Sequence, residues 1–63
     1  MLSNRFSLYG DDGKIECERF GSIWRVWEYG PDNLQGNMEM QVDDIADFVL
    51  YWQDNGYPLL NAI

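Results

Sequence analysis

The chain has 63 residues, of which 46% are hydrophobic and 16% aromatic, and its 11 Asp and Glu residues against four Lys and Arg give a net charge of −7. This length accommodates one small domain, residues 1–63, and the apolar content excludes a disordered acidic tail. The longest apolar run, residues 48–52, is too short to span a bilayer, and a single Cys with no His excludes an internal disulfide and an ordinary zinc site.

The first half of the chain has the pattern of antiparallel strands. Residues 5–9 and 14–20 alternate between apolar and polar positions, as half-buried strands do. Residues 10–13 between them suit a tight hairpin loop, because Gly and Asp tolerate a positive φ angle. Residues 23–29 are rich in β-branched and aromatic side chains on both faces, which predicts a central strand. Residues 21–22 connect this strand to the previous one as a second tight turn.

The second half begins with a polar loop at residues 33–37, and the alternation of residues 38–42 then predicts a short fourth strand. The apolar tail at residues 59–63 is expected to pack either on the sheet or on a partner.

A helix follows the fourth strand. Its apolar side chains recur at the spacing of one helical face, and Asp43 or Asp44 is expected to accept the free N–H groups of its first turn. Asn55-Gly56 predicts its end, and Pro58 prevents its resumption. The expected fold is therefore α+β: a three- to four-stranded antiparallel β-meander with one C-terminal amphipathic helix packed on one face. The apolar stripe of the helix is Ile45, Phe48, Val49 and Trp52.

Acidic side chains gather on the expected helix. At about 100° per residue, four carboxylates share the arc opposite the apolar stripe, and no cation lies among them. Two interpretations remain open: a solvated face that keeps the protein soluble, or a negative surface shaped for a basic partner. The four residues are Asp43, Asp44, Asp47 and Asp54.

The first hairpin supplies a second acidic group. Asp11 and Asp12 lie at its tip, and Glu16 and Glu18 project from one strand face, roughly 6.6–6.8 Å apart along the strand. Phosphates along a nucleic-acid strand recur on a similar scale, so these carboxylates could imitate a nucleic-acid backbone. An ordinary solvent-exposed face is the alternative.

Trp24 and Trp27 supply candidate anchors for a partner. Their odd separation places them on opposite faces of one strand, so one packs under the helix and the other is more exposed. An exposed Trp is typical of a binding hot spot. Aromatic side chains also stack on single-stranded nucleic acid, but the few cations are interrupted by acids, which argues against direct nucleic-acid binding.

The sequence predicts no catalytic, metal or cofactor site. Without His, Ser-His and Cys-His arrangements cannot form within this chain. Cys17 lies on the apolar side of its strand, which predicts a buried, unreactive thiol. Residues 32–39 contain oxygen ligands but lack the spacing of an EF-hand loop. No phosphate-binding Gly loop opens a helix.

These observations predict a small acidic protein-binding module, most simply cytoplasmic because the chain begins with Met and shows no secretory signal. The expected function is inhibition or modulation of a nucleic-acid-handling protein by DNA or RNA mimicry, of the kind found in phage or mobile-element anti-defence proteins such as anti-CRISPR proteins. The expected partner is a protein with a basic surface, without direct contact to nucleic acid or membrane. A structural homodimer or an accessory subunit of a larger assembly is the alternative.

Overall fold

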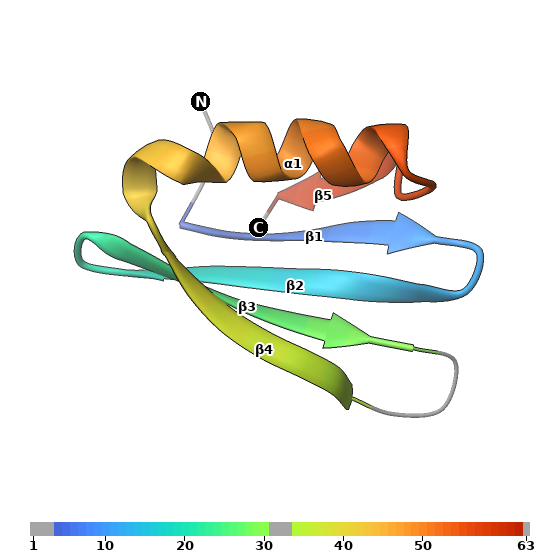
Figure 1. The fold of residues 1–63 in the computed structure, drawn as a ribbon, viewed down its shortest axis with the longest axis horizontal. Helices are drawn as coiled ribbons and strands as arrows, with labels where there is room; N and C mark the ends of the chain where they lie inside the picture. The colour runs from blue at the N-terminus through green and yellow to red at the C-terminus, as the bar shows by residue number, and fades with distance from the viewer. Residues whose placement is uncertain (1–3, 31–33, 63) are drawn as a thin grey trace.

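The computed structural model of the chain describes residues 4–30 and 34–62. Within these residues, one antiparallel sheet with the strand order β4-β3-β2-β1-β5 carries a helix on one face (Figure 1). The predicted α+β fold is confirmed. The elements in chain order are β1 (Arg5–Gly10), β2 (Gly13–Phe20), β3 (Ile23–Tyr29), β4 (Leu34–Gln41), the 3₁₀ turn η1 (Val42–Asp44), the helix α1 (Ile45–Asp54) and β5 (Leu59–Ala62).

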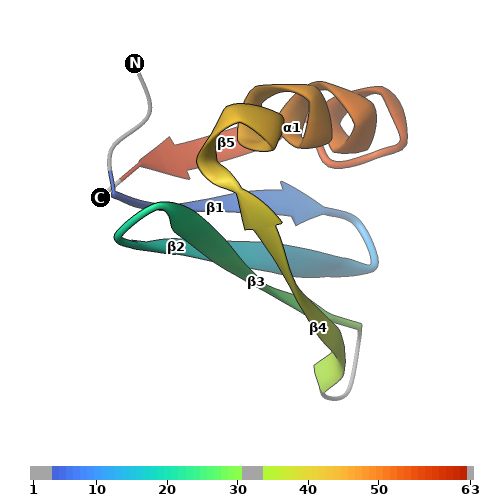
Figure 2. The ribbon, with the colours of Figure 1, turned by 60° about the vertical axis from the view of Figure 1, so that its left-hand side comes forward.

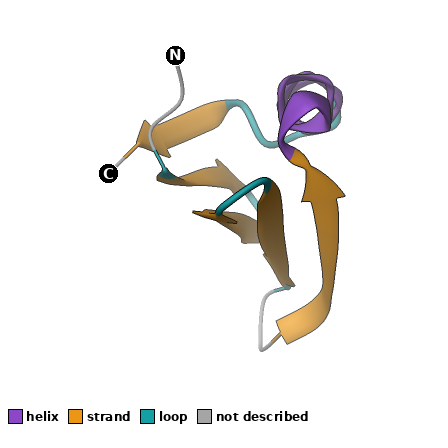
Figure 3. Ribbon diagram, turned by 90° about the vertical axis from the view of Figure 1, so that its left-hand side faces the viewer, coloured by secondary structure: helices purple, strands orange, loops and turns teal. Residues whose placement is uncertain are grey.

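The sheet is strongly twisted. Figure 2 shows β4 crossing the other strands steeply on its way to α1. Figure 3 shows that the sheet curves between its edges, and that α1 lies beside the end of β4. The end of β4 is tied to the β2–β3 turn, because the Val42 amide donates to the Ser22 carbonyl over 3.1 Å. This contact joins the residue that follows β4 to the β2–β3 turn.

The fourth strand is longer than the sequence indicates. It starts at Leu34 instead of residue 38, and pairs with β3 as far as Tyr29, so the predicted polar loop at residues 33–37 is wrong from Leu34 onward. Polar residues are tolerated there because β4 is an edge strand with only one hydrogen-bonded neighbour. Val42, the predicted last residue of this strand, belongs to η1.

The tail forms a fifth strand. Residues 59–62 pair antiparallel with β1, with Leu60 opposite Leu8. Of the two outcomes that the sequence left open, packing on the sheet is the one found for these residues, while Ile63 lies outside the described residues.

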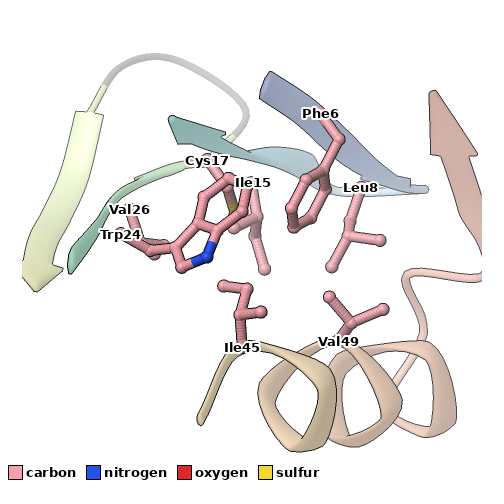
Figure 4. Packing of buried hydrophobic residues seen from close by; sticks show 8 residues of the cluster. All are labelled: Phe6, Leu8, Ile15, Cys17, Trp24, Val26, Ile45 and Val49. Atoms are coloured by element: carbon pink, nitrogen blue, oxygen red, sulfur yellow. The ribbon is translucent and has the colours of Figure 1, made fainter. Parts of the chain in front are cut away.

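The core lies between one face of the sheet and α1 (Figure 4). The two strand patterns and the helical stripe meet there as expected, and Phe6 and Trp24 pack edge to face with ring centroids 5.1 Å apart. The indole N–H of Trp24 is buried and has no hydrogen-bond partner in the structure. The buried residues of this cluster are Phe6, Leu8, Ile15, Cys17, Trp24, Val26, Ile45 and Val49.

The helix ends as predicted. Gly56 has a φ angle of +103°, and the Tyr57 amide donates to the Trp52 carbonyl over 2.9 Å, which is the six-to-one bond of a Schellman C-terminus. The Asn55 side-chain amide also donates to the Tyr51 carbonyl. These bonds satisfy carbonyl groups that the last helical turn leaves free.

The first hairpin has a different physical basis from the one predicted. Gly10 pairs with Gly13, so the loop is the two residues Asp11 and Asp12. Neither glycine has a positive φ angle, and no non-glycine residue of the described chain has one, so the explanation by positive φ is wrong here. A positive φ angle does occur in the second turn, at Gly21, where φ is +65°.

Close backbone approach explains the glycine at position 13. A Cβ on Gly13 would overlap the carbonyl oxygen of Tyr29. Gly13→Ala should therefore destabilise the fold by about 1–3 kcal/mol, the usual cost of overpacking. Urea unfolding of this variant, compared with Gly36→Ala, measures the effect. Gly36 also lies in a strand, but nothing is within 4 Å of an added Cβ there, so equal stability of the two variants would contradict the explanation.

Candidate protein-binding surface

The open face of the sheet, opposite α1, carries charges that alternate in sign from strand to strand. Directly opposed residues of neighbouring strands share a face. Arg5 of β1 is opposite Glu18 of β2, Glu18 is opposite Arg25 of β3, and Arg25 is opposite Glu39 of β4. The Arg25 Nε lies 3.3 Å from the Glu39 Oε2.

Glu16 also has a cationic neighbour on this face. The Lys14 Nζ lies 2.9 Å from the Glu16 Oε2, and this hydrogen bond, together with the carboxylate charge, raises the pKa of Lys14. The open face therefore balances three acids, Glu16, Glu18 and Glu39, against Arg5, Lys14 and Arg25. Glu16 and Glu18 do share one strand face, as predicted, but they add no excess negative charge to it.

The structure separates the two candidate anchors on β3. Trp24 is 2% exposed and belongs to the core, so its prediction as a partner-binding residue is wrong for the folded chain. Trp27 points to the open face and is half-buried. The Arg25 guanidinium lies 5.9 Å from the centroid of the Trp27 ring, so this indole already has a cationic neighbour within the chain.

The acids at the start of α1 do not cap it. Asp44 occupies the N-cap position with φ −92° and ψ −10°, and its side chain makes no capping hydrogen bond. The chain enters α1 through η1, so Asp44 already has helical backbone angles, whereas a capping residue is usually extended. The capping prediction is wrong, and the exposed Asp43 and Asp44 carboxylates are not used by the helix backbone.

The remaining predicted acids lie along the helix and beyond its far end. Asp47 and Asp54 are exposed on α1, and Asp11 and Asp12 are exposed in the β1–β2 turn. That turn adjoins the end of α1, because a Cβ on Gly10 would lie only 2.5 Å from the Gly56 carbonyl oxygen. The fold therefore places Asp11 and Asp12 at the same end of the molecule as Asp54, with Asp43 and Asp44 at the other end of the helix.

The excess charge lies in one part of the sequence. Residues 1–25 carry four cations and four acids and are neutral, whereas residues 26–63 carry seven acids and no Lys or Arg. Four of those seven acids are on η1 and α1. The last turn of α1 contains no basic residue, so Asp54 lies near the negative end of the helix dipole without compensation from that turn.

Two exposed apolar side chains lie among these carboxylates. Leu50 and Tyr51 are 60% and 59% exposed. Sequence reasoning missed both as candidate contacts, although the signal was present. The apolar run at residues 48–52 goes around the helix, and the stripe formed by Phe48, Val49 and Trp52 leaves Leu50 and Tyr51 on the outer side.

Packing of aromatic rings holds Tyr51 in place. Its ring lies perpendicular to that of Trp52, with centroids 5.5 Å apart. Trp52 also packs edge to face on Phe48 at 6.3 Å and on Tyr57 at 5.2 Å. Because Phe48, Trp52 and Tyr57 pack against the core, this series of rings connects the exposed Tyr51 to the rigid interior.

Comparison with protein-family models, with curated proteins and with solved structures found no match for the chain.

Features typical of metal sites, ligand pockets and membrane-spanning helices are absent from the described residues. Across residues 4–30 and 34–62 no three His, Cys, Asp or Glu side chains are grouped as a metal site requires, and no surface pocket is present. Asp32 and Asn33, from the segment considered as a cation loop, lie outside the described residues. No helix of the described chain is long and apolar enough to cross a membrane.

The thiol of Cys17 is buried, as predicted. Burial, with a contribution from the Glu16 charge, raises the pKa of Cys17 from 9.0 to about 12. Since only the thiolate is nucleophilic, iodoacetamide at neutral pH should label Cys17 only after the chain unfolds in urea. Rapid labelling of the native protein would contradict this assignment.

The same shift has a consequence for stability. The unfolded thiol ionises near pH 9, whereas the folded thiol stays neutral until about pH 12. The contribution of Cys17 is therefore fully present below pH 9 and is lost as the pH rises from 9 to 12.

Proposed function

We propose that the chain is a small acidic protein-binding module that occupies the basic surface of a nucleic-acid-handling protein in place of DNA or RNA. The observation that carries this proposal is the segregation of charge: the open sheet face is balanced, and the exposed carboxylates of η1, α1 and the adjoining β1–β2 turn are not. A groove lined with Lys and Arg attracts such a surface over long distances.

The length of the acidic helix is suitable for this role. From Asp43 to Asp54 the chain rises about 16 Å at 1.5 Å per residue, which is about five steps along one nucleic-acid strand at 3.4 Å per step. In this proposal the chain acts in the cytoplasm, catalyses no reaction and needs no cofactor. A CRISPR effector countered by a phage or mobile-element protein is one target of the expected chemistry.

Competition with nucleic acid tests the proposal. Proteins captured from a bacterial lysate at low salt are identified by mass spectrometry, and each is then incubated with a fluorescent oligonucleotide. The expected result is that the chain displaces the oligonucleotide from its captured partner, because both occupy the same basic groove. Simultaneous binding of the chain and the oligonucleotide would refute mimicry, even if the partner is genuine.

Two variants of equal net charge make this test specific. The helix-acid variant carries Asp43→Asn, Asp47→Asn and Asp54→Asn. The sheet-acid variant carries Glu16→Gln, Glu18→Gln and Glu39→Gln, and so removes the same number of charges from the balanced face. Only the helix-acid variant should need a concentration about tenfold higher to displace the oligonucleotide.

A structural homodimer is the second candidate, because β4 and β5 are both edge strands. Met38 on β4 and Leu60 on β5 are exposed apolar side chains on those edges, and unpaired edges are templates for pairing with another chain. Light scattering across a range of protein concentrations distinguishes the two functions: a constant dimer mass favours the structural role, and a monomer mass excludes it.

A further inference from the structure

The outer face of α1 has an apolar centre. Among the large apolar side chains of the described residues, Leu50 and Tyr51 are the most exposed; Phe20 follows at 48%. A single exposed Leu is ordinary on a protein surface. Here two such side chains are adjacent on a helix whose inner side is already filled by core contacts.

Carboxylates flank this pair on both sides. Asp47 precedes Leu50 by three residues and Tyr51 by four, and Asp54 follows them by four and three. Residues at these helical spacings are surface neighbours, with Cβ atoms about 5–6 Å apart. Each carboxylate therefore lies beside both apolar side chains, and the four residues form one continuous patch, here called the outer helix patch.

Tyr51 of the outer helix patch is held in place before any partner arrives. Tyr51 packs on Trp52, which itself packs on Tyr57, and the Asn55 amide donates to the Tyr51 carbonyl over 2.6 Å. A contact side chain that is already ordered costs less entropy on binding than a mobile one.

We propose that the outer helix patch is a docking surface for a cationic amphipathic helix of a protein partner, which sets Lys or Arg on the carboxylates and an apolar stripe on Leu50 and Tyr51. This inference rests on the proposed function and specifies which partner surface the acidic helix recognises. The occupant has to bring the cations, because residues 26–63 contain none.

Charge complementarity selects this occupant over two others. A second copy of the chain would place Asp47 and Asp54 against equivalent carboxylates, which repel. A groove lined by cations alone would pair with the carboxylates but leave Leu50 and Tyr51 in water. A helix with both features satisfies the carboxylates and removes the apolar pair from water, as binding hot spots do.

Two synthetic peptides of equal length and equal positive charge test the inference. One is an amphipathic helix of Leu and Lys, and the other contains Lys, Ser and Gly and has no apolar stripe. The amphipathic peptide should bind at least about tenfold more tightly, measured by fluorescence anisotropy at low salt, and amide NMR shifts should map it to α1. Leu50→Ser with Tyr51→Ser should remove this preference, and Leu50→Ser alone should reduce it if the double variant fails to fold.

Phe20→Ser is the matched control, since Phe20 is exposed but lies at the β2–β3 turn. It should leave both affinities unchanged. Equal binding of both peptides at α1, lost in the helix-acid variant, would overturn the apolar anchor while leaving the acid-driven function intact. Binding mapped to the open sheet face, or no binding of either peptide, would overturn the docking surface itself.

Discussion

Trp24→Ala is expected to leave the chain largely unfolded at 25 °C. The side chain is 2% exposed and packs on Phe6 at the centre of the core. Removing a buried Trp typically costs about 3–5 kcal/mol, and a core of this size rarely supplies more than about 3–5 kcal/mol in total. Loss of near-ultraviolet circular dichroism and collapse of the amide NMR spectrum would show the effect.

Two further replacements separate burial from the loss of any indole. Trp27→Ala removes an indole of the same strand from the open face and should cost only about 1 kcal/mol, mainly from the lost contact with Arg25. Trp24→Phe keeps a ring in the core and removes the N–H that has no hydrogen-bond partner, so it should destabilise far less than Trp24→Ala. A Trp24→Ala variant as stable as Trp27→Ala would refute the central position of Trp24.

The parts of the fold that the sequence predicted correctly are those where burial repeats with a fixed period. Phe6 and Leu8 alternate with polar neighbours in β1, and Ile45 and Val49 are one helical turn apart, so each pattern indicates the side that enters the core. Gly56 was equally predictable as the helix end, because few residues other than glycine adopt its positive φ angle.

The missed parts depend on partners distant in the chain. The start of β4 contains Gln35, Gly36 and Asn37, residue types that favour a loop, and its pairing with β3 as far as Tyr29 makes it a strand. The tail forms β5 because the chain returns along β1 after the helix. The composition of these two segments therefore predicted a loop for the first and left the second undecided.

Predicting the candidate surface also required the cross-strand register, which local sequence patterns do not give. Parity placed Trp24 and Trp27 on opposite faces, but the side on which α1 packs decided which of them is buried. Alternation correctly placed Glu16 and Glu18 on one face of β2, but it did not show that Arg5 and Arg25 lie opposite Glu18 on the two adjacent strands. The outer position of Leu50 followed from the helical stripe alone and was available from the sequence.

The helix-acid variant is expected to bind its partner about tenfold more weakly than the parent chain at low salt. Exposed ion pairs contribute about 0.2–1 kcal/mol each, so three lost pairs amount to about 1–2 kcal/mol, which is close to one factor of ten in Kd. Most of the loss should appear in the association rate, since long-range attraction mainly steers the encounter. Stopped-flow kinetics across a range of ionic strength measures both quantities.

The sheet-acid variant determines whether the position of the charges or their number matters. It changes the net charge by the same amount, but it removes carboxylates that have cationic neighbours, such as Glu16 beside Lys14 and Glu39 beside Arg25. If recognition depends on the exposed acids of the helix, this variant keeps its affinity and its steep decline of association rate with salt. If both variants weaken equally, attraction depends only on total charge, and the acidic helix is then a solvated face that keeps the protein soluble.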